Sequence, residues 1–153
     1  MIQVILLNEI NFVYAPTLET FQTWVDAVTK TIPEKIPSHC YELCISIINT
    51  ETSAYLNETY RQKKGPTNVL SFNYDAMPGV PQDSLGDLAI CGQVVEDEAL
   101  SQHKTLISHF AHLTVHGVLH LLGYDHINDD EALSMETLEI EILKQLGIDN
   151  PYC

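Results

Sequence analysis

The chain carries the sequence HGVLHLLGYDH at residues 116–126, which contains three histidines and two glycines. His116 and His120 are four residues apart, so on an α-helix they lie about 40° apart around the axis and ~6 Å apart along it. Gly123 accepts the left-handed conformation that ends a helix, and the turn after it can bring His126 back toward the other two. The spacing therefore predicts three neutral imidazoles around one divalent metal with one open position, as in catalytic zinc sites.

The metzincin proteases place their ligands at the same spacing, in the pattern His-Glu-x-x-His-x-x-Gly-x-x-His. One position differs, because Gly117 stands where those proteases keep the glutamate that deprotonates the attacking water. The sequence therefore disfavours a peptidase mechanism but leaves metal binding intact.

A competing set of histidines precedes the motif on the same expected helix. His109, His112, His116 and His120 fall within an arc of about 80°, and a single histidine on an apolar helix is more often a hydrogen-bonded core residue than a ligand. Only the pair His116 and His120 is followed by the glycine turn and a third histidine. We therefore expect His109 and His112 to line the approach to the metal or to hydrogen bond behind its ligands.

Length and composition predict one globular domain spanning residues 1–153. The chain is 45% hydrophobic, enough for a core without disulfides, and no segment approaches the length of a membrane span. The opening MIQVILLNEI lacks a cationic start and is expected to be a strand, not a signal peptide. Free thiols and a cytoplasmic location are expected, because no paired C-x-x-C spacing occurs among Cys40, Cys44, Cys91 and Cys153.

The net charge of −14 argues against a general nucleic-acid binder, because such proteins draw affinity from neutralising phosphates. The few cations are nevertheless clustered: three of the seven Lys and Arg residues are Arg61, Lys63 and Lys64, whereas acidic residues crowd the segment 129–141. This pattern indicates a narrow phosphate contact or a docked partner. The alternative is that the cluster only places cations at the end of a helix, where they are favourable.

Hydrophobic periodicity and turn residues predict a mixed α/β (α+β) domain, with a small sheet of about four strands packed against helices. Strands are expected at 2–7, 41–48, 69–74 and 85–91, and helices at 17–30, 50–61, 103–122 and 129–146. Thr50 is the expected N-cap of the second helix, and Gly92 is expected to end the last strand.

Several segments of the chain match one family in order and spacing. They are LNETYRQKKGPTNVLSF at 56–72, LGDLAIC at 85–91, HFAHLTVHGVLHLLGYDH at 109–126 and the tail 129–152. Together they resemble YbeY, the bacterial rRNA-maturation endoribonuclease family. The resemblance implies a zincin-like fold and a zinc-dependent, single-strand-specific endoribonuclease that acts in ribosomal RNA processing, including the 3′ end of small-subunit RNA, and in ribosome quality control.

The resemblance also assigns roles to individual residues. His116, His120 and His126 match the family's ligands for one zinc ion per chain, and Arg61 matches its essential arginine, so the predicted catalytic residues are Arg61 and His116. The implied partners are single-stranded or ribosomal RNA, small-subunit ribosomal proteins and the assembly GTPase Era, with no membrane. The chain departs from the family at Lys64, where the family carries an acidic residue, so no role for that carboxylate transfers to this chain.

Residues near the motif have two interpretations each. Asp125 is expected either to orient an imidazole or to form the turn, and Tyr124 is expected to pack. The aromatic residues Tyr60, Phe72 and Tyr74 are candidates for stacking on RNA bases, although core packing is the commoner role. Two other functions stay open: a metalloprotease-like or other metal-dependent hydrolase, and a non-catalytic ribosome-assembly factor with a structural metal.

Overall fold

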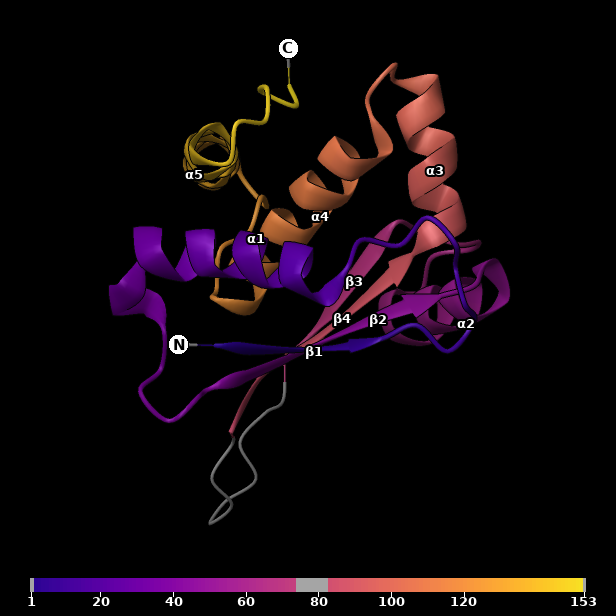
Figure 1. Cartoon of the computed structure of the whole chain (residues 1–153), viewed down its shortest axis with the longest axis horizontal. Coiled ribbons are helices and arrows are strands. Elements are labelled where there is room, and N and C mark those ends of the chain that lie inside the picture. The colour runs from indigo at the N-terminus through magenta and orange to yellow at the C-terminus, as the bar shows by residue number, and fades with distance from the viewer. Residues whose placement is uncertain (1, 74–82, 153) are drawn as a thin grey trace.

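The computed structural model describes residues 2–73 and 83–152 (Figure 1). Along these residues five α-helices and four strands follow one another in a mixed α/β order, with β3 followed by β4 and the last three helices consecutive. Their bounds are β1 Gln3–Leu7, α1 Leu18–Thr31, the short 3-10 helix η1 Pro33–Lys35, β2 Glu42–Ile48, α2 Thr50–Arg61, β3 Val69–Phe72, β4 Ser84–Cys91, α3 Gly92–Ser101, α4 Leu106–Leu121 and α5 Asp129–Gln145. The predicted fold class is confirmed.

The sheet has the strand order β1-β2-β4-β3. The first three strands are parallel, and β3 runs antiparallel to β4 at the edge. In the register, Ile45 of β2 lies opposite Leu6 of β1 and Leu88 of β4, while Phe72 of β3 lies opposite Asp87. The sheet is therefore mixed, and its only antiparallel pair within the described residues lies at the β3 edge.

Helices α1 and α4 lie across one face of this sheet, and α5 packs on their outer side (Figure 1). The pattern of β2 explains the arrangement, because its alternate residues Leu43, Ile45 and Ile47 are buried while those between them are only partly covered. Helix α4 is the central element and buries ten of its sixteen residues. Phe110 of α4 meets Phe21 of α1 edge to face, with 6.4 Å between ring centroids.

Side-chain caps set the starts of α1, α2, α4 and α5, and three expectations about helices need correction. The N-cap of α2 is Asn49, whose Oδ1 accepts from the Thr52 amide at 2.8 Å, so Thr50 is the first helical residue instead. Helix α4 begins at Leu106, not at residue 103, because Thr105 caps it. Helix α3 was not predicted: it follows β4 directly, and no side-chain cap marks its start.

The predicted strand 69–74 ends at Phe72, and Tyr74 lies outside the described residues. Within residues 2–73 and 83–152, every helix is too short or too polar to cross a membrane.

Candidate active site

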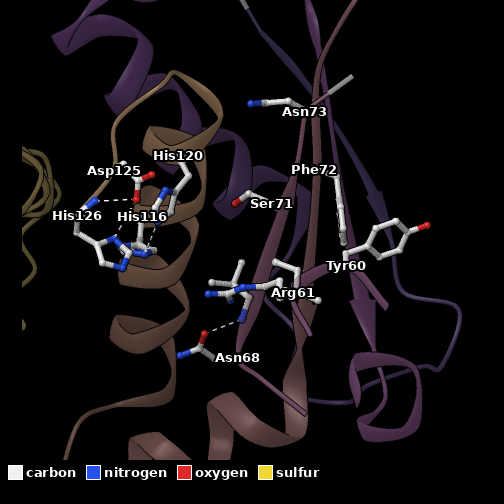
Figure 2. A pocket seen from close by; sticks show the side chains of 12 residues that line it. Tyr60, Arg61, Asn68, Ser71, Phe72, Asn73, His116, His120, Asp125 and His126 are labelled. Carbon is white, nitrogen blue, oxygen red and sulfur yellow. Dashed lines mark hydrogen bonds and ion pairs between the residues drawn. The ribbon is translucent and has the colours of Figure 1, made fainter. Parts of the chain in front are cut away.

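Three histidines meet at the C-terminal end of α4, beside the edge strand β3 (Figure 2). His116 and His120 project from successive turns of the helix, and His126 comes from the loop that follows. Their ring centroids are 4.5 Å apart for His116 and His120, 5.8 Å for His116 and His126, and 5.2 Å for His120 and His126. One ligand nitrogen from each ring lies within 4.8 Å of the others, so the three side chains could hold one metal ion.

The turn after α4 has the geometry that the sequence predicts. Gly123 has φ +99°, and its amide donates to the carbonyl of His120 at 3.0 Å. The Tyr124 amide then donates to the carbonyl of Leu119 at 3.0 Å, which closes the helix end. This reversal brings His126 back beside the last turn of the helix.

Hydrogen bonds fix which nitrogen of each helical histidine faces the cluster. The Nδ1 of His120 donates to the carbonyl of Tyr124 at 3.0 Å, and the Nδ1 of His116 donates to the carboxylate of Glu139. In a neutral ring the Nε2 atom is then the one with the free electron pair. The two Nε2 atoms face one another 3.0 Å apart. Two such electron pairs repel at this distance unless a cation lies between them, so the donor set fits a metal ion.

The pKa of His120 supports this protonation state. Burial lowers the pKa of the imidazole, and the neighbouring His116 and His126 lower it further. A neutral imidazole is the form that binds a metal.

Glu139 is the site residue that the sequence analysis missed. It lies on α5 and is fully buried, and it accepts hydrogen bonds from His116 and from the hydroxyl of Tyr152. Burial raises the pKa of this carboxyl, but hydrogen bonds from His112, His116 and Tyr152 outweigh it and bring the pKa to about 2. Glu139 therefore faces His116 as a carboxylate, the arrangement that orients metal-binding histidines in other proteins.

The sequence does contain a signal for Glu139. The sequence places Glu139 in the acidic segment 129–141, yet the buried positions of α5 are Met135, Glu139, Ile142 and Leu143. Their spacing of four, three and one residues follows a single helical face. Burying a glutamate on the apolar face of an amphipathic helix costs free energy unless the carboxylate has a partner. The position of Glu139 in the sequence therefore indicates a buried carboxylate with a polar partner.

Asp125 takes the turn-forming role of its two expected roles. Its Oδ1 accepts from the backbone amide of His126 at 2.8 Å, and it lies 3.8 Å from the Nδ1 of the same residue. Tyr124 packs against the core as expected, and it also contributes the carbonyl that holds His120.

His109 and His112 lie behind the three clustered histidines and do not line the pocket. His109 is 3% exposed, and its Nε2 bonds a carboxylate oxygen of Glu98 at 2.9 Å. His112 places its Nε2 3.3 Å from the Tyr152 hydroxyl and 3.5 Å from Glu139. Of the two expected roles, the structure favours hydrogen bonding behind the ligands.

Arg61 reaches the same pocket from the last residue of α2. The pocket has a volume of about 630 Å³, and its lining also includes Asn68, Ser71, Phe72, Asp125 and the three histidines. Among the residues that the structure describes, no carboxylate forms an ion pair with Arg61. The guanidinium therefore faces the pocket with its donors available for a phosphate group.

The loop after α2 is held in place by buried polar side chains. Ser53 accepts from the Thr67 amide and donates to its carbonyl, both at 2.9 Å, and Asn57 donates to the carbonyl of Gly65 at 2.9 Å. These bonds tie the helix to the loop that leads into β3. Of the three clustered cations, only Arg61 lines the pocket; Lys63 and Lys64 are exposed beyond it.

Comparison with known proteins identifies the family. The sequence profile described as endoribonuclease YbeY matches residues 8–147. The chain belongs to this family. A YbeY endoribonuclease of Coxiella burnetii (strain RSA 493 / Nine Mile phase I) is 50% identical over 153 residues, covering 99% of each chain. That of Colwellia psychrerythraea is 50% identical over 137 residues, covering 90% of this chain and 88% of the relative.

A solved structure supports the fold of this YbeY-family chain. The solution structure of the Thermotoga maritima protein TM1509 matches it with a TM-score of 0.58 at 17% identity, covering 94% of this chain and 91% of the other. At that identity the likeness shows a shared fold alone.

The YbeY-family chain replaces the metzincin glutamate for a steric reason that the structure makes plain. Gly117 faces the sheet: a Cβ atom there would lie 2.8 Å from Cδ2 of Leu88 and 3.3 Å from Oγ of Ser71. Ser71 in turn donates to the carbonyl of Gly117 at 3.2 Å, so α4 rests directly on β3. A glutamate at position 117 would require the side chains of Leu88 and Ser71 to shift.

Proposed function

We propose that the protein is a zinc-dependent, single-strand-specific endoribonuclease that matures ribosomal RNA, including the 3′ end of the small-subunit RNA, and serves ribosome quality control. Membership of an endoribonuclease family supports cleavage of RNA. We further propose that residues 1–153 act as a single domain in the cytoplasm.

The observation that carries the proposal is the presence of Arg61 and the three histidines in one pocket. In this proposal His116, His120 and His126 hold one zinc ion per chain. Bound zinc lowers the pKa of a water ligand toward ~7 and polarises a phosphoryl oxygen. Arg61 and His116 are the proposed catalytic residues: Arg61 binds the scissile phosphate through two parallel N–H donors and stabilises the charge that builds on its oxygens.

The surrounding residues hold this arrangement before the substrate arrives. Glu139 and the carbonyl of Tyr124 fix the rings of His116 and His120, and neither ring needs to rotate for its Nε2 to face the pocket. A preorganised site of this kind loses little energy to rearrangement in the transition state.

The proposed substrate is single-stranded ribosomal RNA, and the strongly acidic chain limits how it is held. With a net charge of −14 the chain as a whole repels RNA, and Arg61 is the Lys or Arg residue that lines the pocket. Protein partners can bring the RNA to this pocket. In the proposal these are small-subunit ribosomal proteins and the assembly GTPase Era.

Two alternatives receive less support. A peptidase or other metalloprotease-like hydrolase lacks its general base at Gly117, and a side chain there would press on Leu88 and Ser71. A ribosome-assembly factor with a structural metal has no need of an arginine in this pocket that forms no ion pair within residues 2–73 and 83–152.

The test measures zinc per chain and cleavage of a fluorescent single-stranded RNA and of its duplex. We expect about one zinc per chain and cleavage of the single strand only. His120→Ala is expected to lose both, and Arg61→Ala to keep zinc and fold but lose cleavage. Lys64→Ala is the matched control, because Lys64 belongs to the same cationic cluster but does not line the pocket. Zinc without RNA cleavage in the wild type would favour the assembly factor.

A further inference from the structure

An exposed tyrosine and a half-buried phenylalanine form an aromatic pair at the edge of the pocket. Tyr60, the penultimate residue of α2, is 61% exposed, and Phe72 is the last residue of β3. Their ring centroids are 5.3 Å apart and their planes meet at 72°, an edge-to-face contact. A tyrosine with this exposure is not a core residue, and both rings line the same pocket as the histidines.

The pair stands on the wall of the pocket opposite the metal cluster. Figure 2 shows the histidines on the α4 side and the two aromatic rings on the other side of β3, with Arg61 below both groups in this view. The Phe72 ring is seen edge-on, and Tyr60 lies on its far side from the histidines with its hydroxyl pointing away from them. Ser71 points toward α4, so Phe72, the next residue of the strand, points to the other side of β3. There it contacts Tyr60, whose ring is mostly open to solvent at the edge of the pocket.

Because the chain is strongly acidic, an aromatic surface can add RNA affinity that its few cations do not supply. Proteins that bind single strands combine a cationic groove for the backbone with aromatic rings for the bases. Here the pocket lining contains one cation, Arg61, in a chain with only seven Lys and Arg residues. Phosphate contacts alone thus supply little affinity, and stacking is the contribution that an acidic protein can still provide.

We propose that the exposed ring of Tyr60, held in place by Phe72, stacks an unpaired RNA base next to the phosphate bound by Arg61. This inference rests on the proposed endoribonuclease function and assigns its single-strand specificity to two residues. A base in a duplex already stacks on its neighbours and pairs with its partner, so it cannot also lie against Tyr60. A free base can, whatever its identity, because every base has a π-face.

The test uses a short single-stranded RNA that contains the fluorescent base 2-aminopurine, mixed with the zinc-loaded protein by stopped flow before cleavage. Stacking on an aromatic ring is expected to quench the fluorescence on binding. Phe72→Leu and Tyr60→Ala are expected to lose most of the quenching and to bind the RNA roughly 5- to 150-fold more weakly. Tyr60→Phe keeps the ring and is expected to behave as the wild type.

Tyr55→Ala is the matched control, because Tyr55 is also an exposed tyrosine on α2, at 66% exposure, but does not line the pocket. It is expected to bind as the wild type does. The same RNA with abasic sites in place of its central bases is expected to bind weakly and equally to wild type, Tyr60→Ala and Phe72→Leu. That insensitivity separates stacking from a general disturbance of the pocket.

The outcomes distinguish this inference from the function on which it rests. If the wild type cleaves RNA, and Tyr60→Ala and Phe72→Leu still show full quenching and wild-type affinity, the stacking proposal is wrong and the endoribonuclease function stands. Quenching in a wild type that never cleaves RNA would support the stacking surface and contradict the endoribonuclease. Circular dichroism checks the fold of Phe72→Leu, and Tyr60→Ala keeps the test decisive because its side chain is largely in solvent.

Discussion

The carboxylate of Glu139 on α5 accepts a hydrogen bond from Nδ1 of His116 on α4, and no part of Glu139 reaches solvent. The hydroxyl of Tyr152, in the C-terminal segment after α5, donates to the other carboxylate oxygen. A chain of contacts thus runs from the C-terminal segment through a buried charge to the metal cluster. It holds the His116 ring in the tautomer whose Nε2 is free to bind an ion.

Replacing Glu139 with Gln is expected to weaken metal binding roughly 10- to 100-fold, since an amide is a poorer acceptor for the imidazole N–H and leaves the ligand less basic. The measurement is zinc affinity by competition with a chelator. Glu141→Gln is the control, because Glu141 is an exposed acid on the same helix. Equal affinities in the two variants would show that Glu139 serves only the packing of α5.

The cluster of three histidines could be predicted from the sequence because its geometry is local. His116, His120, Gly123 and His126 lie within eleven residues, and helical spacing with one glycine turn fixes where their side chains point. The sheet was predictable for a similar reason, since the alternation in β2 and the apolar face of α4 follow simple periods.

The supporting contacts were not predictable, because they depend on how distant segments pack. Glu139 is 23 residues from His116, and only the docking of α5 on α4 brings them together. Arg61 entered the candidate site through family resemblance, not through spacing. Helix α3 could not be predicted because a glycine after a strand indicates the end of that strand, and no capping side chain indicates that a helix begins at Gly92.

Glu98 makes the stability of the protein depend on pH. It bonds Nε2 of His109 at 2.9 Å and accepts from Asn68 at 3.0 Å. The bond with His109 lowers the pKa of the Glu98 carboxyl; burial opposes the shift, and Asn68 adds to it. A carboxyl whose folded pKa lies below its unfolded value of about 4.3 stabilises the fold above that value, and the contribution is lost as the pH falls through the folded pKa.

The wild type is therefore expected to be more stable than Glu98→Gln near neutral pH, with a difference that shrinks as the pH falls from about 5 to about 3. Urea midpoints across this range measure it. Asp97→Asn, an exposed position on the same helix, is the control and is expected to track the wild type. A gap between wild type and Glu98→Gln that stays constant with pH would rule out this role for the Glu98 charge.

Gly117 is expected to tolerate no side chain without loss of stability. Gly117→Ala would place its Cβ 2.8 Å from Cδ2 of Leu88, which is fully buried between α4 and the sheet. Such overpacking costs about 1–3 kcal/mol, measured as the change in free energy of unfolding in urea. The double variant Gly117→Ala/Leu88→Ala is expected to be less destabilised than the sum of the single variants, because the second change removes the clash. If the two destabilisations simply add in the double variant, the cost of Gly117→Ala does not come from the contact with Leu88.

Gly123 is expected to connect backbone conformation to metal binding. Its φ of +99° is unfavourable for any residue with a Cβ, although nothing lies within 4 Å of where that atom would be. Gly123→Ala should therefore cost about 1–2 kcal/mol of stability through backbone strain alone. When the loop relaxes to relieve that strain, His126 leaves its position, so zinc affinity is expected to fall by up to about tenfold, the equivalent of about 1.4 kcal/mol.

The chain offers a matched control for this prediction in Gly147, which has φ +76° just after α5 and is equally free of neighbours. Gly147→Ala is expected to lose a similar amount of stability in urea while its zinc affinity, measured by chelator competition, stays at the wild-type value. If both alanine variants bound zinc as the wild type does, the position of His126 would not depend on the Gly123 turn, and the loop after α4 would have to be held by other contacts.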